Sequence, residues 1–551
     1  MLAPTARLTA RGAPFEILEA EIDGIPCRVY RHAPKTLADL YRKAERYAQR
    51  EFIACGQRRL TYGTILERAR VVAGALSAGI DVRDGARVAL IGRNRPEWVI
   101  VFIANTLGGA TAVVIHHAAT TEQIIEAIDV AECTAVIADE DVARSLSDQG
   151  DRRPVLLVQE DGEPPVGSFH MPRDAQAAVA SAAGPLAGPV DPEQPALIAF
   201  TSGSTGRAKG VVLNHRSVLT GLMNMLLGGA AASAGRPPAR GSSPVSLVLA
   251  PFSHISGYSN FLLMWHLGGR IVTLAEGSTD DVLRHLEAEG ATSLVGATPA
   301  MIRELIRLPD QVRHRAGSLR SLNIHGAHLN SGLLAEIAGA LPHVTVGTGY
   351  GLTETNGSVC VASGPMLLER PGTCGEPLPT VDLRIATEDG TEVPRGETGE
   401  IWLRGAMIMQ GYCNSAEANA RALCKGWLRT GDLGRLDTDG YLHVIDRMTR
   451  TIVQDGVEVS CGDVESIVLD ARLAAEAAAF VIEDPECGER LVLMVVPREG
   501  QDCDSAQVRK ELAAAGISAA AMPRILAIDS LPRTTSGKVD GRELRRRYQE
   551  N

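Results

Sequence analysis

Short apolar runs alternate with longer helical patterns through the first part of the chain. Residues 87–91 (RVALI) and 111–115 (TAVVI) are unbroken apolar runs of the length typical of buried strands, and three isoleucines within residues 121–131 fall on one helical face. The predicted elements are strand 87–91, helix 97–107, strand 111–115, helix 121–131 and strand 134–138. This alternation predicts a parallel sheet with right-handed crossovers.

The same alternation resumes in the middle of the chain. It predicts strands at 246–250, 270–274, 293–296 and 322–325, and helices at 281–289, 301–308 and 331–341. Residues 162–195 are rich in Pro, Gly and Ala, so we expect a surface connection there. The apolar run 218–227 is followed by small residues at 228–235, which predict a loop.

The pattern changes after about Gly440. The later part predicts strands at 441–445, 451–453, 457–459, 491–496 and 524–528, and helices from residue 462 and at 505–514. We therefore predict an α/β protein with two domains. Residues 1–445 form a large N-terminal domain with doubly wound-type sheets, and residues 446–551 form a small, mobile C-terminal α+β domain.

Composition narrows the classes of function. The 551-residue chain has a formal net charge of −11, and its one dense basic run is 545–547, which argues against a nucleic-acid partner. We find no secretory signal and no run of about 18 apolar residues, so no integral membrane association is expected. The ten cysteines form no C-x-x-C pair, which argues against a zinc site or disulfide framework and predicts a cytoplasmic location.

The strongest chemical signal is a Gly- and hydroxyl-rich loop. A strand at 196–200 runs directly into residues 201–210 (TSGSTGRAKG). The glycines let the backbone approach a polyanion, the hydroxyls and N–H groups can donate to phosphate oxygens, and Lys209 adds positive charge. Lys209 does not directly follow Gly206, so this is not a Walker loop. Because apolar strands flank it, phosphate binding is favoured over a flexible linker.

Four further segments suit nucleotide chemistry. In residues 350–355 (YGLTET) the aromatic ring can stack on adenine, a Thr can bond phosphate and the Glu can bind Mg²⁺. In residues 430–432 (TGD) the carboxylate can accept from both ribose hydroxyls. Residues 446–450 (DRMTR) lie near the change of pattern, and residues 532–539 (PRTTSGKV) carry a Gly-flanked lysine.

In this order the five segments resemble the core motifs of the adenylate-forming superfamily. That superfamily contains acyl- and aryl-CoA synthetases, beetle luciferases and peptide-synthetase adenylation domains, and the pattern is most similar to acyl- and aryl-CoA ligases. The resemblance runs from about residue 60 to the C-terminus. It implies ATP-dependent conversion of a carboxylic acid to an acyl-AMP, then transfer of the acyl group to coenzyme A. It also implies rotation of the small domain about a hinge at Thr449.

The resemblance implies site residues one by one. ATP contacts are implied for Thr201, Ser202, Gly203, Ser204, Thr205, Gly206, Lys209, Gly326, Ala327, Tyr350, Asp432 and Arg447. Catalytic roles are implied for Thr353, for Glu354 as the Mg²⁺ ligand, for Lys538 at the α-phosphate and carboxylate, and for His254 as a gate beside the acyl site. The implied acyl pocket consists of Ser256, Asn260, His325, Gly349, Gly351 and Asn356. His116 and His117 match no motif and receive no role.

Departures from the family pattern leave alternatives open. Asp455 places an acid where the anionic coenzyme A would pass, and residues 461–463 (CGD) and 325–328 (HGAH) are altered. The acceptor can therefore also be a carrier-protein thiol, an amine or another nucleophile. A non-catalytic nucleotide-binding relative and a luciferase-type oxygenase are further alternatives. The polar pocket favours an aryl or substituted acid. Residues 252–258 contain no Asp to hold an ammonium group, which argues against an α-amino acid.

Overall fold

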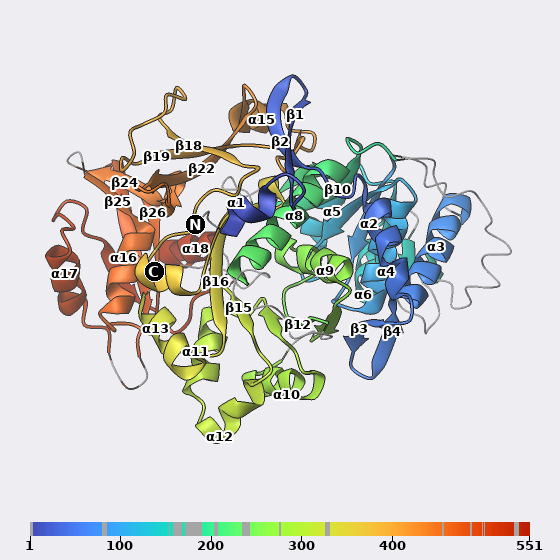
Figure 1. The fold of residues 1–551 in the computed structure, drawn as a ribbon. Coiled ribbons are helices and arrows are strands. Elements are labelled where there is room, and N and C mark those ends of the chain that lie inside the picture. Colours follow the sequence, from blue (N-terminus) through green and yellow to red (C-terminus); the bar gives the residue numbers. More distant parts are fainter. Residues whose placement is uncertain are drawn as a thin grey trace.

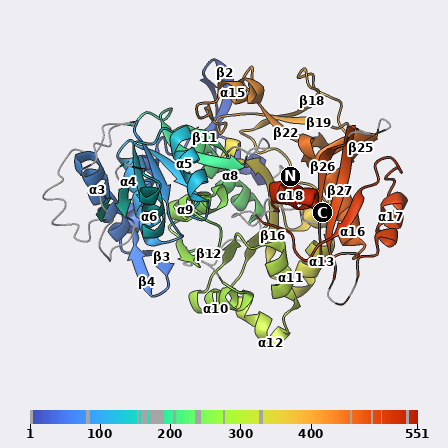
Figure 2. The same cartoon turned by 180° about the vertical axis from the view of Figure 1, so that it is seen from behind.

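The structure, a computed structural model, describes residues 4–79, 85–151, 153, 155–157, 168–170, 190–202, 208–233, 243–274, 277–324, 331–454, 457–484, 488–498, 500, 502–533 and 539–550. Large sheets and the helices between them make up most of the molecule, and the C-terminal elements lie at one side (Figures 1 and 2). The predicted α/β class is confirmed.

The first large sheet carries the strand that leads into the Gly-rich loop predicted to bind phosphate. Its eight strands have the order β20-β11-β10-β6-β5-β7-β8-β9. They are β5 (Arg87–Ile91), β6 (Thr111–Ile115), β7 (Ala135–Ala138), β8 (Val155–Leu157), β9 (Ser168–His170), β10 (Pro195–Ser202), β11 (Ala208–Asn214) and β20 (Gly411–Tyr412). The strands from β10 to β9 run parallel, and β11 and β20 are antiparallel additions at one edge. The predicted parallel arrangement of the first three strands is confirmed.

The second large sheet has the order β17-β16-β15-β14-β12-β13-β3-β4. Its strands are β3 (Glu51–Cys55), β4 (Arg58–Thr61), β12 (Val245–Val248), β13 (Arg270–Thr273), β14 (Ser293–Val295), β15 (Ser321–Asn323), β16 (Thr345–Leu352) and β17 (Gly357–Ser363). The six inner strands are parallel, and β17 and β4 pair antiparallel at the two edges. The predicted helices appear here as α10 (Thr279–Glu289), α11 (Pro299–Arg307) and α13 (Ser331–Ala340).

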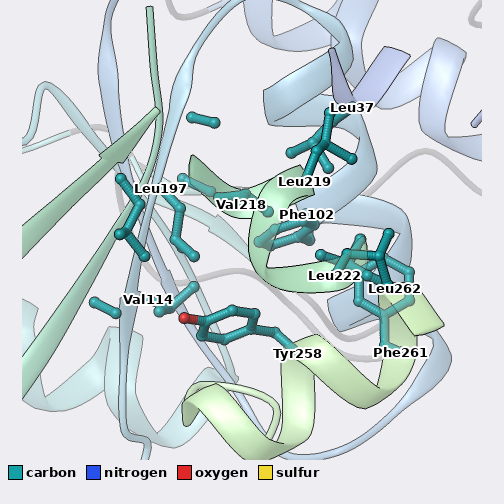
Figure 3. Packing of buried hydrophobic residues seen from close by; sticks show 14 of the residues in the cluster. Leu37, Phe102, Val114, Leu197, Val218, Leu219, Leu222, Tyr258, Phe261 and Leu262 are labelled. Carbon is teal, nitrogen blue, oxygen red and sulfur yellow. The ribbon is translucent and has the colours of Figure 1, made fainter. Parts of the chain in front are cut away.

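Three apolar helices lie in the core that the two sheets share. They are α4 (Pro96–Leu107), α8 (His215–Ala232) and α9 (Ile255–Leu267). Helix α4 contacts β5 and β6 of the first sheet and β3 of the second, which explains why almost all of its residues are buried. Figure 3 shows Phe102 of α4, Leu222 of α8 and Phe261 of α9 packed together. Burial of each such side chain contributes about 1.5–3 kcal/mol.

Helix α8 extends beyond its predicted end. Residues 228–235 were expected to form a loop, but the helix continues to Ala232. The reason is tertiary packing, because a Cβ on Gly228 would lie 3.3 Å from Val361 Cγ2, so the small residue lets the helix approach β17 closely. Glycine lowers helix propensity by roughly 1 kcal/mol, and packing outweighs that cost here.

The remaining helices and hairpins of the N-terminal part surround these sheets. They are α1 (Pro4–Thr9), β1 (Ile17–Ile22), β2 (Ile25–Tyr30), α2 (Leu37–Lys43), α3 (Tyr62–Gly79), α5 (Thr121–Val130), α6 (Glu140–Asp148), α12 (Asp310–Arg313), α14 (Pro365–Glu369) and α15 (Ala416–Ala422). None of the helices in the described ranges has the length and apolar character needed to cross a membrane.

A third sheet, not predicted from the sequence, carries residues 430–432, which are predicted to bind ribose. It consists of the antiparallel strands β18 (Asp382–Ala386), β19 (Gly399–Arg404), β21 (Leu423–Cys424), β22 (Trp427–Leu436) and β23 (Leu442–Arg447). Ile401 and Leu428 belong to the same hydrophobic cluster as the core helices. The sheet is therefore packed onto the large core, which fixes β22 and β23 beside it.

The C-terminal elements have hydrophobic clusters of their own. They are β24 (Thr451–Gln454), β25 (Val457–Ser460), α16 (Cys461–Asp470), β26 (Glu476–Asp484), β27 (Gly488–Val496), α17 (Ser505–Ala514), β28 (Arg524–Ala527) and α18 (Gly541–Glu550). The orange and red ribbons of Figure 1 show them beside the third sheet and α13. An ion pair between Arg472 and Glu336 of α13, at 3.9 Å, links this part to the large sheets.

Candidate active site

Two paired strands flank the Gly-rich loop that is predicted to bind phosphate. β10 and β11 are antiparallel, with Thr201 opposite Lys209 and Ser202 opposite Ala208. Lys209 therefore stands beside Thr201, the first residue of the loop. Gly203, Ser204, Thr205 and Gly206 lie outside the described residues.

Lys209 and Glu354 are connected through a tyrosine. Lys209 Nζ lies 5.1 Å from the centroid of the Tyr412 ring, and the Tyr412 hydroxyl donates to Glu354 Oε1 at 2.8 Å. Tyr412 reaches this position because β20 pairs with β11, which places Tyr412 opposite Val211. Burial and the neighbouring Glu354 charge raise the pKa of Tyr412 well above its usual value, so the hydroxyl keeps its proton.

Glu354 lies on a short turn after β16. The 3-10 helix η3 (Thr353–Thr355) holds both Thr353 and Glu354, and the Met409 N–H donates to the Glu354 carbonyl at 2.9 Å. The glycines of β16 allow this segment to lie close to β17, because a Cβ on Gly351 would lie 2.0 Å from the Gly357 carbonyl oxygen. Gly349 is similarly constrained, because a Cβ on it would lie 2.7 Å from the Cys360 carbonyl oxygen. Both glycines therefore have a backbone role in addition to their predicted place in the pocket.

The expected nucleoside residues form a second connected group. The Tyr350 hydroxyl donates to Asp432 Oδ2 at 2.6 Å, and Arg447 Nε lies 2.7 Å from Asp432 Oδ1. Asp432 and Arg447 face each other in the β22–β23 pair. Arg447 also donates to the Thr430 carbonyl at 3.1 Å. The three predicted residues are thus brought together.

Burial sets the electrostatics of this group. Asp432 is 5% exposed, and burial raises its pKa above the usual value while Arg447 opposes the shift. Burial and the Asp432 charge raise the pKa of Tyr350 far above its usual value, so Tyr350 is a permanent donor. The nearby Glu354 charge also contributes to raising the pKa of Asp432.

The expected acyl side begins at α9. His254 is the N-cap residue of this helix, and its Nδ1 lies 3.1 Å from Ser256 Oγ. Asn260 is buried one turn further on, and its Oδ1 has no hydrogen-bond partner among the described residues. These three predicted residues therefore share the first turns of one helix.

Asn356 is used inside the core. Its Oδ1 accepts from the Tyr258 hydroxyl at 3.1 Å, and its Nδ2 donates to the Val218 carbonyl at 3.0 Å. It adopts φ 47°, a conformation that Asn tolerates better than most residues. The structure therefore gives its amide a structural use, which joins the end of β16 to α8 and α9.

The remaining predicted residues are four that the structure does not describe and the hinge candidate, which it does. His325, Gly326, Ala327 and the expected catalytic lysine, Lys538, lie outside the described residues. The hinge candidate Thr449 lies in the 3-10 helix η4 (Met448–Arg450), directly after β23.

The chain after Thr449 is tied to the C-terminal elements by charged groups. Arg450 pairs with Asp446 at 3.0 Å and with Glu465 at 2.8 Å. Asp446 Oδ2 also accepts from the Gly462 N–H at 2.7 Å. The segment around Thr449 therefore connects β23 to α16 through a compact polar network.

Sequence reasoning missed Tyr412. It lies 58 residues from Glu354 in the chain, and the sequence signal for it was a single Gly–Tyr pair in a short strand. Its role depends on the pairing of β20 with β11, which joins segments about 200 residues apart and has no local signature.

The fold and these residues define a member of the adenylate-forming superfamily, which confirms the predicted resemblance. The family described as AMP-binding enzyme matches residues 40–413, and the AMP-binding enzyme C-terminal domain matches residues 463–538. The chain belongs to the AMP-binding enzyme family.

Curated relatives match most of the chain. It is 28% identical over 495 residues to 4-coumarate-CoA ligase 2 of Narcissus pseudonarcissus, covering 86% of this chain and 85% of the relative. It is 30% identical over 492 residues to a feruloyl-CoA synthase of Amycolatopsis sp, covering 89% and 94%. The predicted similarity to acyl- and aryl-CoA ligases is confirmed.

Solved structures agree with the fold. The amide bond synthetase McbA from Marinactinospora thermotolerans has a TM-score of 0.78 and 26% identity, covering 93% of this chain and 100% of that protein. The anthranilate CoA ligase AuaEII, in complex with anthranoyl-AMP, has a TM-score of 0.80 and 21% identity, covering 94% and 97%. At that identity the second likeness concerns the fold alone.

Proposed function

We propose that this chain is an ATP-dependent ligase that converts a carboxylic acid to its acyl-AMP and transfers the acyl group to coenzyme A. The observation that carries the proposal is the joining of Lys209, Tyr412 and Glu354 beside the phosphate loop, in a chain of the AMP-binding enzyme family. The curated relatives named as CoA ligases support the same choice of acceptor.

In the first half-reaction the acid carboxylate attacks the α-phosphorus of ATP and pyrophosphate leaves. The side chains act by positioning and by charge compensation, because such transfers need little covalent help from the protein. Thr201 and Lys209 bind phosphate oxygens, and Asp432 and Arg447 bind the ribose. When the ribose binds, its hydroxyls replace part of the contact that Tyr350 or Arg447 makes with Asp432. Lys538 compensates the charge that develops between carboxylate and α-phosphate.

The residues present fit a Mg²⁺ ion bound together with ATP. Mg²⁺ is usually held by one or two carboxylates plus phosphate oxygens and water, and Glu354 supplies a part-buried carboxylate whose Oε1 is fixed by Tyr412. No group of three or more His, Cys, Asp and Glu residues in the described ranges is arranged for a metal, which fits a site completed by the nucleotide. When bound, the ion would neutralise phosphate charge.

In the second half-reaction we propose that residues 446–551 rotate as a small domain about Thr449. This movement takes Lys538 away from the acyl-AMP and lets the thiol approach. The position of Thr449 between β23 and β24 supports the proposal, because β23 packs with the large core while β24 belongs to the C-terminal clusters.

We propose an aryl acid as the substrate class. Asn260 presents a buried amide oxygen without a partner among the described residues, and an unpaired buried polar group favours a substrate with a donor over a plain alkyl chain. The names of the curated relatives, which refer to 4-coumarate and feruloyl groups, point to phenolic acids whose hydroxyl can donate.

The test is release of pyrophosphate from ATP and Mg²⁺ with 4-coumarate, ferulate, benzoate or decanoate, each with and without coenzyme A. We expect release with the phenolic acids that accelerates with coenzyme A, and a thioester as product. The Lys538→Ala variant should lose roughly 10²-fold in rate while its melting temperature is kept. Release with decanoate alone would contradict the aryl assignment, and no release with any acid would contradict the function.

An amine acceptor is the second candidate. It is favoured by Asp455, an acid that the sequence resemblance puts near the path of the anionic coenzyme A, and by the fold similarity to an amide bond synthetase at 26% identity. The same assay with an amine in place of coenzyme A decides between the two. Amide formation that exceeds thioester formation at equal acceptor concentration would replace the CoA proposal.

A further inference from the structure

His116 lies at the edge of the first sheet where the phosphate loop begins. β6 and β10 are parallel neighbours, and Val114 opposite Ala199 is their last paired position. His116 directly follows β6, which ends at Ile115, and Thr201 lies near the end of β10. Both residues therefore lie at the carboxyl edge of the parallel strands, where open α/β sheets bind their ligands.

His116 lies near two other histidines, His117 and His254, and the motifs gave no role to His116 or His117. Its ring stacks on His117 with centroids 4.8 Å apart and an interplanar angle of 19°. His254, at the start of α9, is near enough for its charge to act on His116. The segment before His254 is held at this edge by Asn94, which donates to the Ala250 carbonyl at 2.8 Å and accepts from the Phe252 N–H at 2.7 Å.

The hydrogen bonds of His116 fix its tautomer. The Ala118 N–H donates to His116 Nδ1 at 3.1 Å, so the neutral ring carries its proton on Nε2. Nε2 is buried and has no hydrogen-bond partner among the residues that the structure describes. A buried donor without an acceptor is unfavourable, so we expect a bound ligand to supply the acceptor for this N–H group.

The surroundings keep this ring neutral. Burial, together with the charges that His117 and His254 would carry, lowers the pKa of His116 to about 4. At neutral pH His116 is therefore an uncharged N–H donor. A metal site is not supported, since no group of three His, Cys, Asp and Glu residues in the described parts of the chain has the arrangement to hold an ion.

We propose that His116 is a further ATP-binding residue, whose Nε2–H donates to an oxygen of the phosphate chain. The inference rests on the proposed function and adds a phosphate contact outside the Gly-rich loop. An ATP phosphate is favoured over the acid because His116 follows β6, the parallel neighbour of the strand that carries Thr201, while the acyl-side residues His254 and Ser256 already contact each other. With this N–H donor from His116, residues that follow or end both β6 and β10 take part in binding ATP.

The test is direct binding of α,β-methylene-ATP with Mg²⁺, measured calorimetrically without any acid. His116→Phe keeps a planar ring against His117 and removes the N–H, so we expect the Kd to rise roughly tenfold. His116→Gln places an amide nitrogen near the position of Nε2 and should stay within about threefold of the wild type. His116→Asn places its amide near Nδ1, keeps an acceptor for the Ala118 N–H and should bind as weakly as the Phe variant.

His343→Phe, at an exposed loop position before β16, is the matched control and should bind as the wild type does. If His116→Phe does not fold, the comparison of Gln with Asn carries the test. Equal binding by Asn, Gln and wild type would overturn the inference, as would a higher KM for the acid with an unchanged Kd for the analogue. Failure of the wild type to bind the analogue would instead count against the proposed function.

Discussion

Removal of one hydroxyl group tests the connection between Lys209 and Glu354. In Tyr412→Phe the ring stays under Lys209, whose Nζ is 5.1 Å from the ring centroid, and the hydrogen bond of 2.8 Å to Glu354 is lost. A hydrogen bond to a charged group contributes about 1.5–3 kcal/mol. Because Glu354 is partly exposed, water replaces part of the contact and the lower value applies. We expect kcat/KM for ATP to fall about tenfold.

The assay is pyrophosphate release at saturating acid with ATP varied. Tyr412→Leu removes the ring as well, and its kcat/KM for ATP should fall about a further two- to fivefold. This is the effect expected for loss of a part-exposed cation–π contact. Tyr441→Phe is the matched control, because that ring also lies under a guanidinium group, Arg370 at 4.2 Å, away from the phosphate loop. A Tyr412→Phe variant within twofold of the wild type would refute the reasoning.

Two other changes test the ribose group and β16. Arg447→Met removes the counter-charge of Asp432 and should lower the free energy of unfolding at pH 8 by about 2 kcal/mol, less than for a fully buried pair because Arg447 is half exposed. Since burial already raises the pKa of Asp432, the variant should regain stability as the pH falls towards 5, when the carboxyl protonates. Urea unfolding at pH 8 and pH 5 measures this change. An equal loss of stability at both pH values would contradict the expected protonation of Asp432. Gly351→Ala should destabilise by more than about 3 kcal/mol because its Cβ would meet the Gly357 oxygen at 2.0 Å, whereas Gly339→Ala in α13, with no atom within 4 Å, should stabilise by about 0.5–1 kcal/mol. Equal melting temperatures for these two alanine variants would show that the close approach of β16 and β17 is not needed.

Apolar periodicity predicted the central strands of the two large sheets, because a strand that is buried on both faces reads as a continuous apolar run. β6, for example, is TAVVI and is buried at all five positions. The third sheet could not be predicted in this way. The buried alternate positions of β22 are Leu428, Thr430, Asp432 and Gly434, so only one of them is apolar. Its inner face is occupied by site residues, which hides the strand pattern.

The candidate site was predictable to the extent that its chemistry is local. Thr201 and Lys209 follow from one segment, and the structure places them opposite each other. Tyr412 and His116 were out of reach because their partners come from other strands. Tyr412 meets Glu354 through an antiparallel edge strand, and His116 and Thr201 come from the neighbouring parallel strands β6 and β10. Contacts of this kind depend on sheet order, which no single segment encodes.

The products formed from ATP distinguish an acyl-AMP-forming ligase from other ATP-consuming enzymes. ATP, Mg²⁺, 4-coumarate and coenzyme A would be incubated with the full-length chain, and the products separated and identified by mass spectrometry. We expect AMP, pyrophosphate and coumaroyl thioester in equal amounts, with coumaroyl-AMP accumulating when coenzyme A is left out. Formation of ADP and phosphate, or consumption of ATP without an acyl-AMP, would contradict this expectation.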